Sequence, residues 1–166
     1  MIICGMILSS AKEQFRLLLL NPVLMSCISS WLCAQFLKTI INLVYGKIHS
    51  FTQLIEMLIW KTGGLPSSHS ALVASLCTSI GFRHGLNSDM FIISLCFFLV
   101  VIRDAMGVRR SSGMQARKLN EIGKELDEKN IIEYIPLKEV DGHTPMEVIL
   151  GCVLGFLVGL AFSLLK

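Results

Sequence analysis

Two histidines lie in polar clusters whose residue types suit phosphoryl transfer. His69 closes the stretch Lys61-Thr-Gly-Gly-Leu-Pro-Ser-Ser-His69, and His143 lies in Asp141-Gly-His-Thr-Pro-Met-Glu147. A third cluster, Arg103-Asp-Ala-Met-Gly-Val-Arg-Arg110, supplies cations. In such a set one imidazole attacks phosphorus, the other protonates the leaving oxygen, and the cations stabilise the equatorial oxygens.

Each histidine has local support in the sequence. Glu147 follows His143 by four positions, so both lie on one helical face, where the carboxylate can orient the imidazole and stabilise its charged form. Before His69, Gly64 and the amides around Ser67 and Ser68 stand at the start of an apolar run. Backbone N–H groups at a helix start bind anions, so these residues are predicted to bind phosphate.

The elements that must position these clusters are membrane helices. Of the 166 residues, 53% are hydrophobic and 16% are charged, and the mean hydropathy is +0.66, outside the usual composition of a soluble domain. A helix needs about 20 apolar residues to cross a bilayer, and four windows approach this length: about 21–45, 68–82, 86–102 and 145–165. The predicted fold is an all-α polytopic membrane bundle.

Other segments complete the predicted organisation. Residues 1–20 form an N-terminal segment whose apolar start is too short to span a bilayer and lacks the layout of a signal peptide. Residues 21–166 form one membrane domain with a hydrophilic loop at about 107–142, which contains a helix from about 114 to 129. A short interfacial or re-entrant helix is predicted from apolar residues at helical spacing, namely Phe51, Leu54, Ile55, Leu58 and Ile59. The six cysteines lie in or beside apolar runs without a CxxC pair, which favours packing over a disulfide or metal framework.

Alternation of the four predicted spans brings the three polar clusters to one membrane face, with both termini on the other. Most lysines and arginines near the spans fall on the face with the clusters. Because positive residues favour the cytoplasm, that face is predicted to be cytoplasmic.

The motifs also resemble a known family. Pro66-Ser-Ser-His69 resembles the Pro-Ser-Gly-His motif of the type 2 phosphatidic acid phosphatase (PAP2) superfamily, which includes vanadium haloperoxidases. His143-Thr-Pro-Met-Glu147 followed by Gly151 looks like that superfamily's His-x-x-x-Asp motif, with Glu for Asp. The combined motifs are most similar to the small divergent PAP2 membrane proteins, also described as acid phosphatase/vanadium-dependent haloperoxidase-related, from about residue 21 to the C-terminus.

The resemblance implies roles for the two histidines. His143 corresponds to the superfamily's nucleophile, with Glu147 as its partner, and His69 corresponds to the general acid. Two features of the superfamily are missing: its lysine-and-Arg-Pro motif has no intact counterpart, and its Ser-Arg pair is here Pro136-Leu137. The cations that bind phosphate must then come from elsewhere.

Arg109 and Arg110 are the leading candidates for these cations. Lys38 follows, because an intramembrane lysine is energetically unfavourable and Gln35 lies three residues earlier on the same helical face. Lys61 is a weaker supporting candidate, as is Lys138. Asp104 is predicted either to hold an arginine in place or to bind a divalent ion.

Each motif also has a structural interpretation. Pro66-Ser-Ser-His69 could be a helix cap with a polar first turn, and Gly142-His-Thr-Pro145 a loop that begins a helix. The paired arginines could be a topology signal or contact anionic lipid, and Lys38 could snorkel to the interface. These interpretations do not account for both histidines reaching the same face as the arginines.

Three functions follow from these alternatives. The leading one is an integral membrane phosphatase that hydrolyses a lipid-linked or prenyl phosphate or pyrophosphate through a phosphohistidine, with no cofactor and no metal. A second is a non-catalytic membrane protein that binds lipid phosphates. The third is a metal-dependent enzyme like the CDP-alcohol phosphotransferases, faintly indicated by the segment 104–110. Membrane lipids are the predicted surroundings, and no nucleic acid partner is predicted.

Overall fold

The computed structural model describes residues 2–46, 50, 52–55, 64–139 and 142–165, with side chains from residue 11 onward. Every regular element in this part of the chain is a helix, which confirms the all-α prediction. In chain order these are α1 (Ile2–Leu19), α2 (Pro22–Val44), α4 (Ser68–His84), α5 (Asp89–Arg103), the π-helix η1 (Asp104–Val108), α6 (Arg109–Glu128) and α7 (Pro145–Leu164). Residues 52–55 are also helical and lie within the predicted interfacial segment.

The sequence sets the helix boundaries through side-chain caps. Asn21 accepts hydrogen bonds from the amides of Val23 and Leu24 at the start of α2, and Ser67 and Ser88 cap α4 and α5 in the same way. Thr144 and Glu147 form a reciprocal capping box at the start of α7. Such caps satisfy N–H groups that the first turn leaves unpaired, which fixes where each helix begins.

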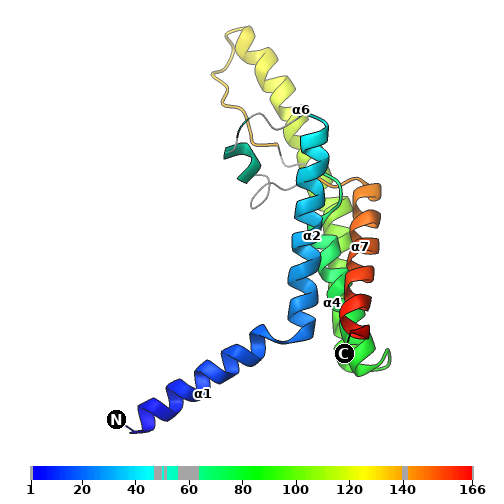
Figure 1. Ribbon diagram of the computed structural model, residues 1–166. Coiled ribbons are helices and arrows are strands. Elements are labelled where there is room, and N and C mark those ends of the chain that lie inside the picture. The colour runs from blue at the N-terminus through cyan, green and yellow to red at the C-terminus, as the bar shows by residue number, and fades with distance from the viewer. Residues whose placement is uncertain (1, 47–49, 51, 56–63, 140–141, 166) are drawn as a thin grey trace.

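Three helices in the described residues are long and apolar enough to cross a membrane: Pro22–Val44, Asp89–Glu128 and Pro145–Leu164. The helix α4, predicted as a fourth span, has 17 residues and many small or polar ones. It contacts α2, α5 and α7, so it lies at the centre of the bundle (Figure 1). Its neighbours shield it, and it therefore does not need a continuous apolar surface.

The hydrophilic segment 107–142 differs from the predicted loop. Its first half continues α5 without a break through η1 into α6, giving a helix of 40 residues, about 60 Å long. The α6 part projects beyond the end of the bundle (Figure 1). The predicted helix at 114–129 is thus present but begins five residues earlier, at Arg109.

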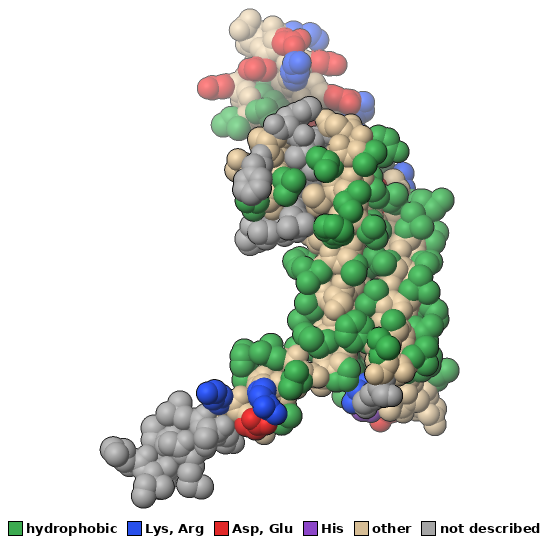
Figure 2. Space-filling view, viewed as in Figure 1, with side chains coloured by type: hydrophobic (Ala, Val, Ile, Leu, Met, Phe, Trp, Pro, Cys, Tyr) green, Lys and Arg blue, Asp and Glu red, His purple; other side chains and the backbone are tan. Residues whose placement is uncertain are grey.

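The bundle has small and polar side chains inside and apolar ones outside. Ser26, Ser30, Gln35 and Lys38 are all buried on α2, whereas large apolar side chains such as Phe36 are exposed. Apolar side chains cover the flanks of the bundle in Figure 2, and charged ones gather toward its two ends. This distribution suits a hydrocarbon surrounding, in which apolar surface needs no burial.

Candidate functional site at the ends of four helices

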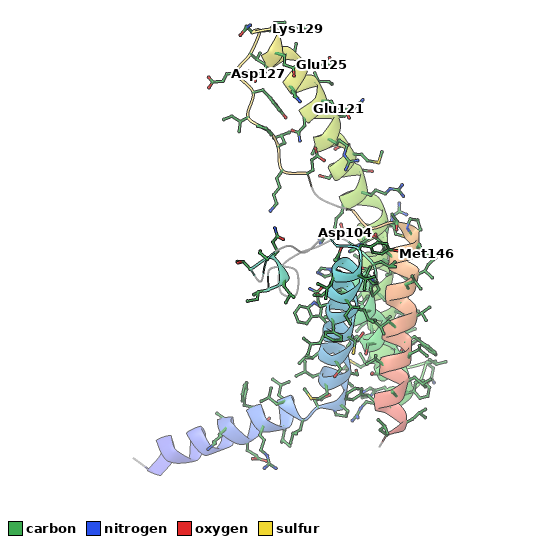
Figure 3. All side chains as sticks on the ribbon, turned by 45° about the horizontal axis from the view of Figure 1, so that its top comes forward. Asp104, Glu121, Glu125, Asp127, Lys129 and Met146 are labelled. Carbon is green, nitrogen blue, oxygen red and sulfur yellow. The ribbon has the colours of Figure 1, made fainter. Side chains whose placement is uncertain are left out.

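One end of the bundle gathers the C-terminal end of α2, the N-terminal ends of α4 and α7, and the turn from α5 into η1. The amide of Ser67, just before α4, donates to the carbonyl of Glu147 in the first turn of α7, at 3.0 Å. Helix α7 also contacts η1, and the side chains of Asp104 and Met146 lie at this same end (Figure 3). The described parts of the three polar clusters therefore meet at one end of the bundle, as the alternation of spans predicted.

His143 and Glu147 form a buried pair within the site. The imidazole Nδ1 lies 3.0 Å from Glu147 Oε2, and the histidine is 5% exposed. The same Oε2 accepts the amide of Thr144 at 3.0 Å. With Nδ1 directed at the carboxylate, Nε2 is the nitrogen left to act on a ligand.

His69 lies in the first turn of α4 and its side chain is exposed. Its imidazole interacts electrostatically with Arg109, His143, Lys38 and Asp104. Residues from α2, α4, η1, α6 and the start of α7 therefore share one electrostatic environment. It contains two cations, Lys38 and Arg109, which can attract an anion, and two carboxylates, Asp104 and Glu147.

Lys38 is a buried cation beside this group. It is 1% exposed and interacts electrostatically with Glu147, and its Nζ has no hydrogen bond or ion pair with any residue that the structure describes. Gly64 approaches its side chain closely: a Cβ added to this glycine would lie 3.7 Å from Lys38 Cγ, and its φ of +88° favours glycine. Gln35, one turn earlier, is also buried.

The two neighbouring arginines are used differently. The Nε of Arg109 donates to Asp104 Oδ2 at 2.6 Å, so Asp104 holds an arginine, one of its two predicted roles. Arg110 instead contributes its backbone, which packs against Gly142. Its guanidinium has no hydrogen bond or ion pair with the described part of the chain.

The serines before and within α4 are buried rather than open to the site's surface. Ser67 and Ser68 are 0% and 3% exposed. Ser70, which was not among the predicted residues, donates its hydroxyl to Ser67 Oγ at 2.9 Å. Lys61 lies outside the described residues.

Two further residues, Thr144 and Gly142, contribute to the site, and the sequence could have indicated both. Thr144 and Glu147 match the S/T-x-x-E signature of a capping box, and this cap fixes the carboxylate that faces His143. Gly142 permits close contact with α6, since an added Cβ would lie 2.3 Å from Arg110 Cα. No group of three or more His, Cys, Asp or Glu side chains suited to hold a metal occurs among the described residues.

Fold and site together define a helical membrane protein with a two-histidine site at one end of its bundle. Residues 19–158 match the Divergent PAP2 family, and the chain belongs to that family. It is also similar to the uncharacterized membrane protein YuiD of Bacillus subtilis (strain 168), with 34% identity over 157 residues, covering 88% of this chain and 96% of the relative. No solved structure gives a significant match. The chain is thus an integral membrane protein.

Proposed function

We propose that the protein is an integral membrane phosphatase that hydrolyses a lipid-linked or prenyl phosphate or pyrophosphate through a phosphohistidine on His143. The buried contact between His143 and Glu147, beside His69, is the observation that carries this proposal. The carboxylate holds Nδ1, so the lone pair of Nε2 is free to attack phosphorus. Lys38 and Arg109 supply positive charge for the phosphoryl oxygens.

The proposed reaction has two steps. In the first, His143 Nε2 forms a bond to phosphorus, the bond from phosphorus to the leaving oxygen breaks, and His69 gives that oxygen a proton. In the second, His69 takes a proton from water, the water oxygen attacks phosphorus, and the P–N bond breaks. Inorganic phosphate leaves and both histidines return to their starting states.

One observation favours a non-catalytic member of the family as a second candidate. Glu147 already completes the capping box of α7, so its contact with His143 could serve helix structure alone. Such a protein would bind lipid phosphates without turnover.

Phosphate release from phosphatidic acid and from farnesyl pyrophosphate, by protein in lipid nanodiscs, tests the proposal. His143→Ala should abolish release, and His69→Ala should slow it and lengthen the life of an acid-labile, base-stable phosphoenzyme. His84→Ala is the matched control, because His84 is exposed at the other end of α4. Binding of these lipids without any release by the unaltered protein would support the non-catalytic candidate instead.

A further inference from the structure

The interface between α2 and α4 carries a line of buried small and polar residues, of which the proposed reaction uses only Lys38. Ser26 Oγ and Ser79 Oγ lie 2.8 Å apart across this interface. The helices run antiparallel (Figure 1). Each step of four residues toward the C-terminus of α2 is therefore matched by a step of four residues toward the N-terminus of α4, which places further pairs opposite each other. These pairs are Ser30 with Ser75, Ala34 with Ala71, and Lys38 with Ser67. All eight side chains are at most 2% exposed, and we name this line the α2–α4 seam.

Three polar atoms in or beside this seam are buried without a hydrogen-bond partner in the described structure: Ser30 Oγ, Ser75 Oγ and Gln35 Oε1. Other helical hydroxyls behave differently. Thr39, Thr78 and Ser94 each donate to a carbonyl of their own helix at 2.8 Å. The unpartnered atoms are therefore available to a bound molecule.

Helix register places Ser30 and Ser75 at one level, and side-chain direction leans Gln35 and Ser75 toward intermediate levels. In a helix the Cα–Cβ bond leans toward the N-terminus. Gln35 therefore leans down α2 toward the level of Ser30, and Ser75 leans up α4 toward the level of Gln35. Ser30 and Ser75 share a level by the register that the Ser26–Ser79 contact sets.

Polar groups continue from this region to both ends of the bundle. Toward one end, Ser79 lines a cavity of about 280 Å³ together with Arg83, His84 and Ser163. Toward the other end, Lys38 follows Gln35 by one turn and reaches the site with the two histidines. The seam thus lies between the Ser79 cavity at one end of the bundle and the two-histidine site at the other.

We propose that the α2–α4 seam binds water, held by Ser30, Ser75 and Gln35. Water matches the chemistry of the three atoms: it can donate to the amide oxygen and both donate to and accept from the hydroxyls. Two to four polar partners are what a buried water requires. Ala34 and Ala71 lie between the level of Ser30 and that of Lys38, and their small side chains place no bulky group between the backbones of α2 and α4. This inference does not depend on the proposed phosphatase activity.

Water-edited solid-state NMR on serine-labelled protein in lipid bilayers tests the proposal, because magnetisation passes from water to nearby residues. Ser111, exposed on α6, is the wet reference, and Ser94, buried and bonded to its own helix, is the dry one. We expect Ser30 and Ser75 to gain signal from water at a rate close to that of Ser111. Rates as slow as that of Ser94 would overturn the proposal, and this comparison needs no variant.

A variant then assigns the residues that hold the water. Ser75→Ala combined with Gln35→Met removes two of the three polar partners with little change in side-chain volume. We expect the transfer of magnetisation from water to Ser30 to be lost, while the transfer from water to Ser111 is unchanged. Undiminished transfer to Ser30 in a folded double variant would show that other groups bind the water and would overturn the assignment.

Discussion

The Glu147 carboxylate faces two partners, the amide of Thr144 and the imidazole of His143. Glu147→Gln would keep an oxygen for the helix cap but remove the negative charge beside the imidazole. We therefore expect phosphate release to fall on the order of 100-fold or more, with an unchanged melting temperature. Kinetics and thermal unfolding of the same preparation measure both quantities. Full activity in the variant would show that the carboxylate serves only the cap.

Gly142 occupies a position where the start of α7 meets the start of α6. A Cβ there would lie 2.3 Å from Arg110 Cα and 2.5 Å from Arg110 N, and neither backbone atom can rotate away. Gly142→Ala should therefore lower the free energy of unfolding by about 1–3 kcal/mol and weaken phosphate binding. Gly107→Ala is the control, because a Cβ at Gly107 meets nothing within 4 Å. Equal thermal stability of the two variants would contradict the prediction.

The sequence indicated which charged residues and histidines meet at this end of the bundle, but not how the two neighbouring arginines divide their roles. His69, His143, Glu147, Lys38 and Arg109 share one electrostatic environment, as their topology indicated. Arg109 and Arg110 are adjacent, and one helical step turns a side chain by about 100°. Whether Arg109 or Arg110 contacts Asp104 therefore depends on how η1 turns the helix, and a π-helix cannot be recognised in a single sequence.

Helix α7 packs on α4 through glycines spaced four residues apart. A Cβ at Gly155 would lie 2.1 Å from the carbonyl oxygen of Ala71, and one at Gly159 would lie 2.9 Å from that of Ser75. Small residues at this spacing let helix backbones approach closely in membranes. Gly155→Leu should thus separate α4 from α7, destabilise the fold and move His143 away from His69. Leu157→Ala, on an exposed position of α7, should have little effect on unfolding in detergent.

An extended segment returns along α6 and is held there by polar contacts. Asn120 donates to the Leu137 carbonyl at 2.9 Å and to Glu139 at 3.0 Å, and Tyr134 donates to Asn120. The ring of Tyr134 lies against Gly123. This part of the molecule extends beyond the bundle, and Figure 3 labels Glu121, Glu125, Asp127 and Lys129 on it.

The attachment of this segment should weaken in acid. Hydrogen bonds from Asn120 and Arg117 lower the pKa of Glu139 below its ordinary value. A lowered folded-state pKa means that the stabilisation is present above the ordinary pKa, and is lost as the pH falls below about 4 and through the lowered value. The protection of the Leu137 amide against hydrogen exchange, taken relative to the intrinsic exchange rate at each pH, should fall in that range. Glu139→Gln should remove the transition; a transition that persists would assign it to another group.

Helix existence was predictable from apolar runs, whereas helix continuity was not. The shift from apolar to charged residues near 103–110 indicated the end of a span, and it does mark where apolar composition ends. The backbone nevertheless continues, because α6 residues form a good helix in water as well as beside the membrane. Gly107 does not interrupt it, since it lies within η1.

The whole bundle places polar groups inside and apolar groups outside. Exposed apolar side chains lie on all three candidate spans, including Phe36 on α2, Ile93 on α5 and Phe156 on α7. The composition predicted a membrane protein. The buried serines of α4 explain why its sequence is only weakly apolar. Which helices pair was not predictable from the sequence, because the four-residue glycine spacing of α7 does not identify the helix that packs against it.

Orientation in the membrane is the property of the whole molecule that remains a prediction. Lysines and arginines near the spans are more numerous at the end with the site, where Arg103, Arg109, Arg110, Arg117 and Lys118 lie, than at the opposite end, where Arg16 and Arg83 lie. Because positively charged residues are retained in the cytoplasm, we expect the α6 end to face it. Asn130→Cys, just beyond α6, should react with an impermeant maleimide only after the cells are opened.

Native thiols set the background for this labelling experiment. Cys33 and Cys96 are exposed on the flanks of the bundle, where lipid should shield them from a water-soluble reagent. The unaltered protein gives the baseline, and a cysteine added after Lys166 reports the opposite end of α7 in the same cells. We expect that added cysteine to react in intact cells, because α7 is long enough to cross the membrane once. Reaction of Asn130→Cys in intact cells, with protection of the C-terminal cysteine, would reverse the orientation and place the histidine site on the outer face.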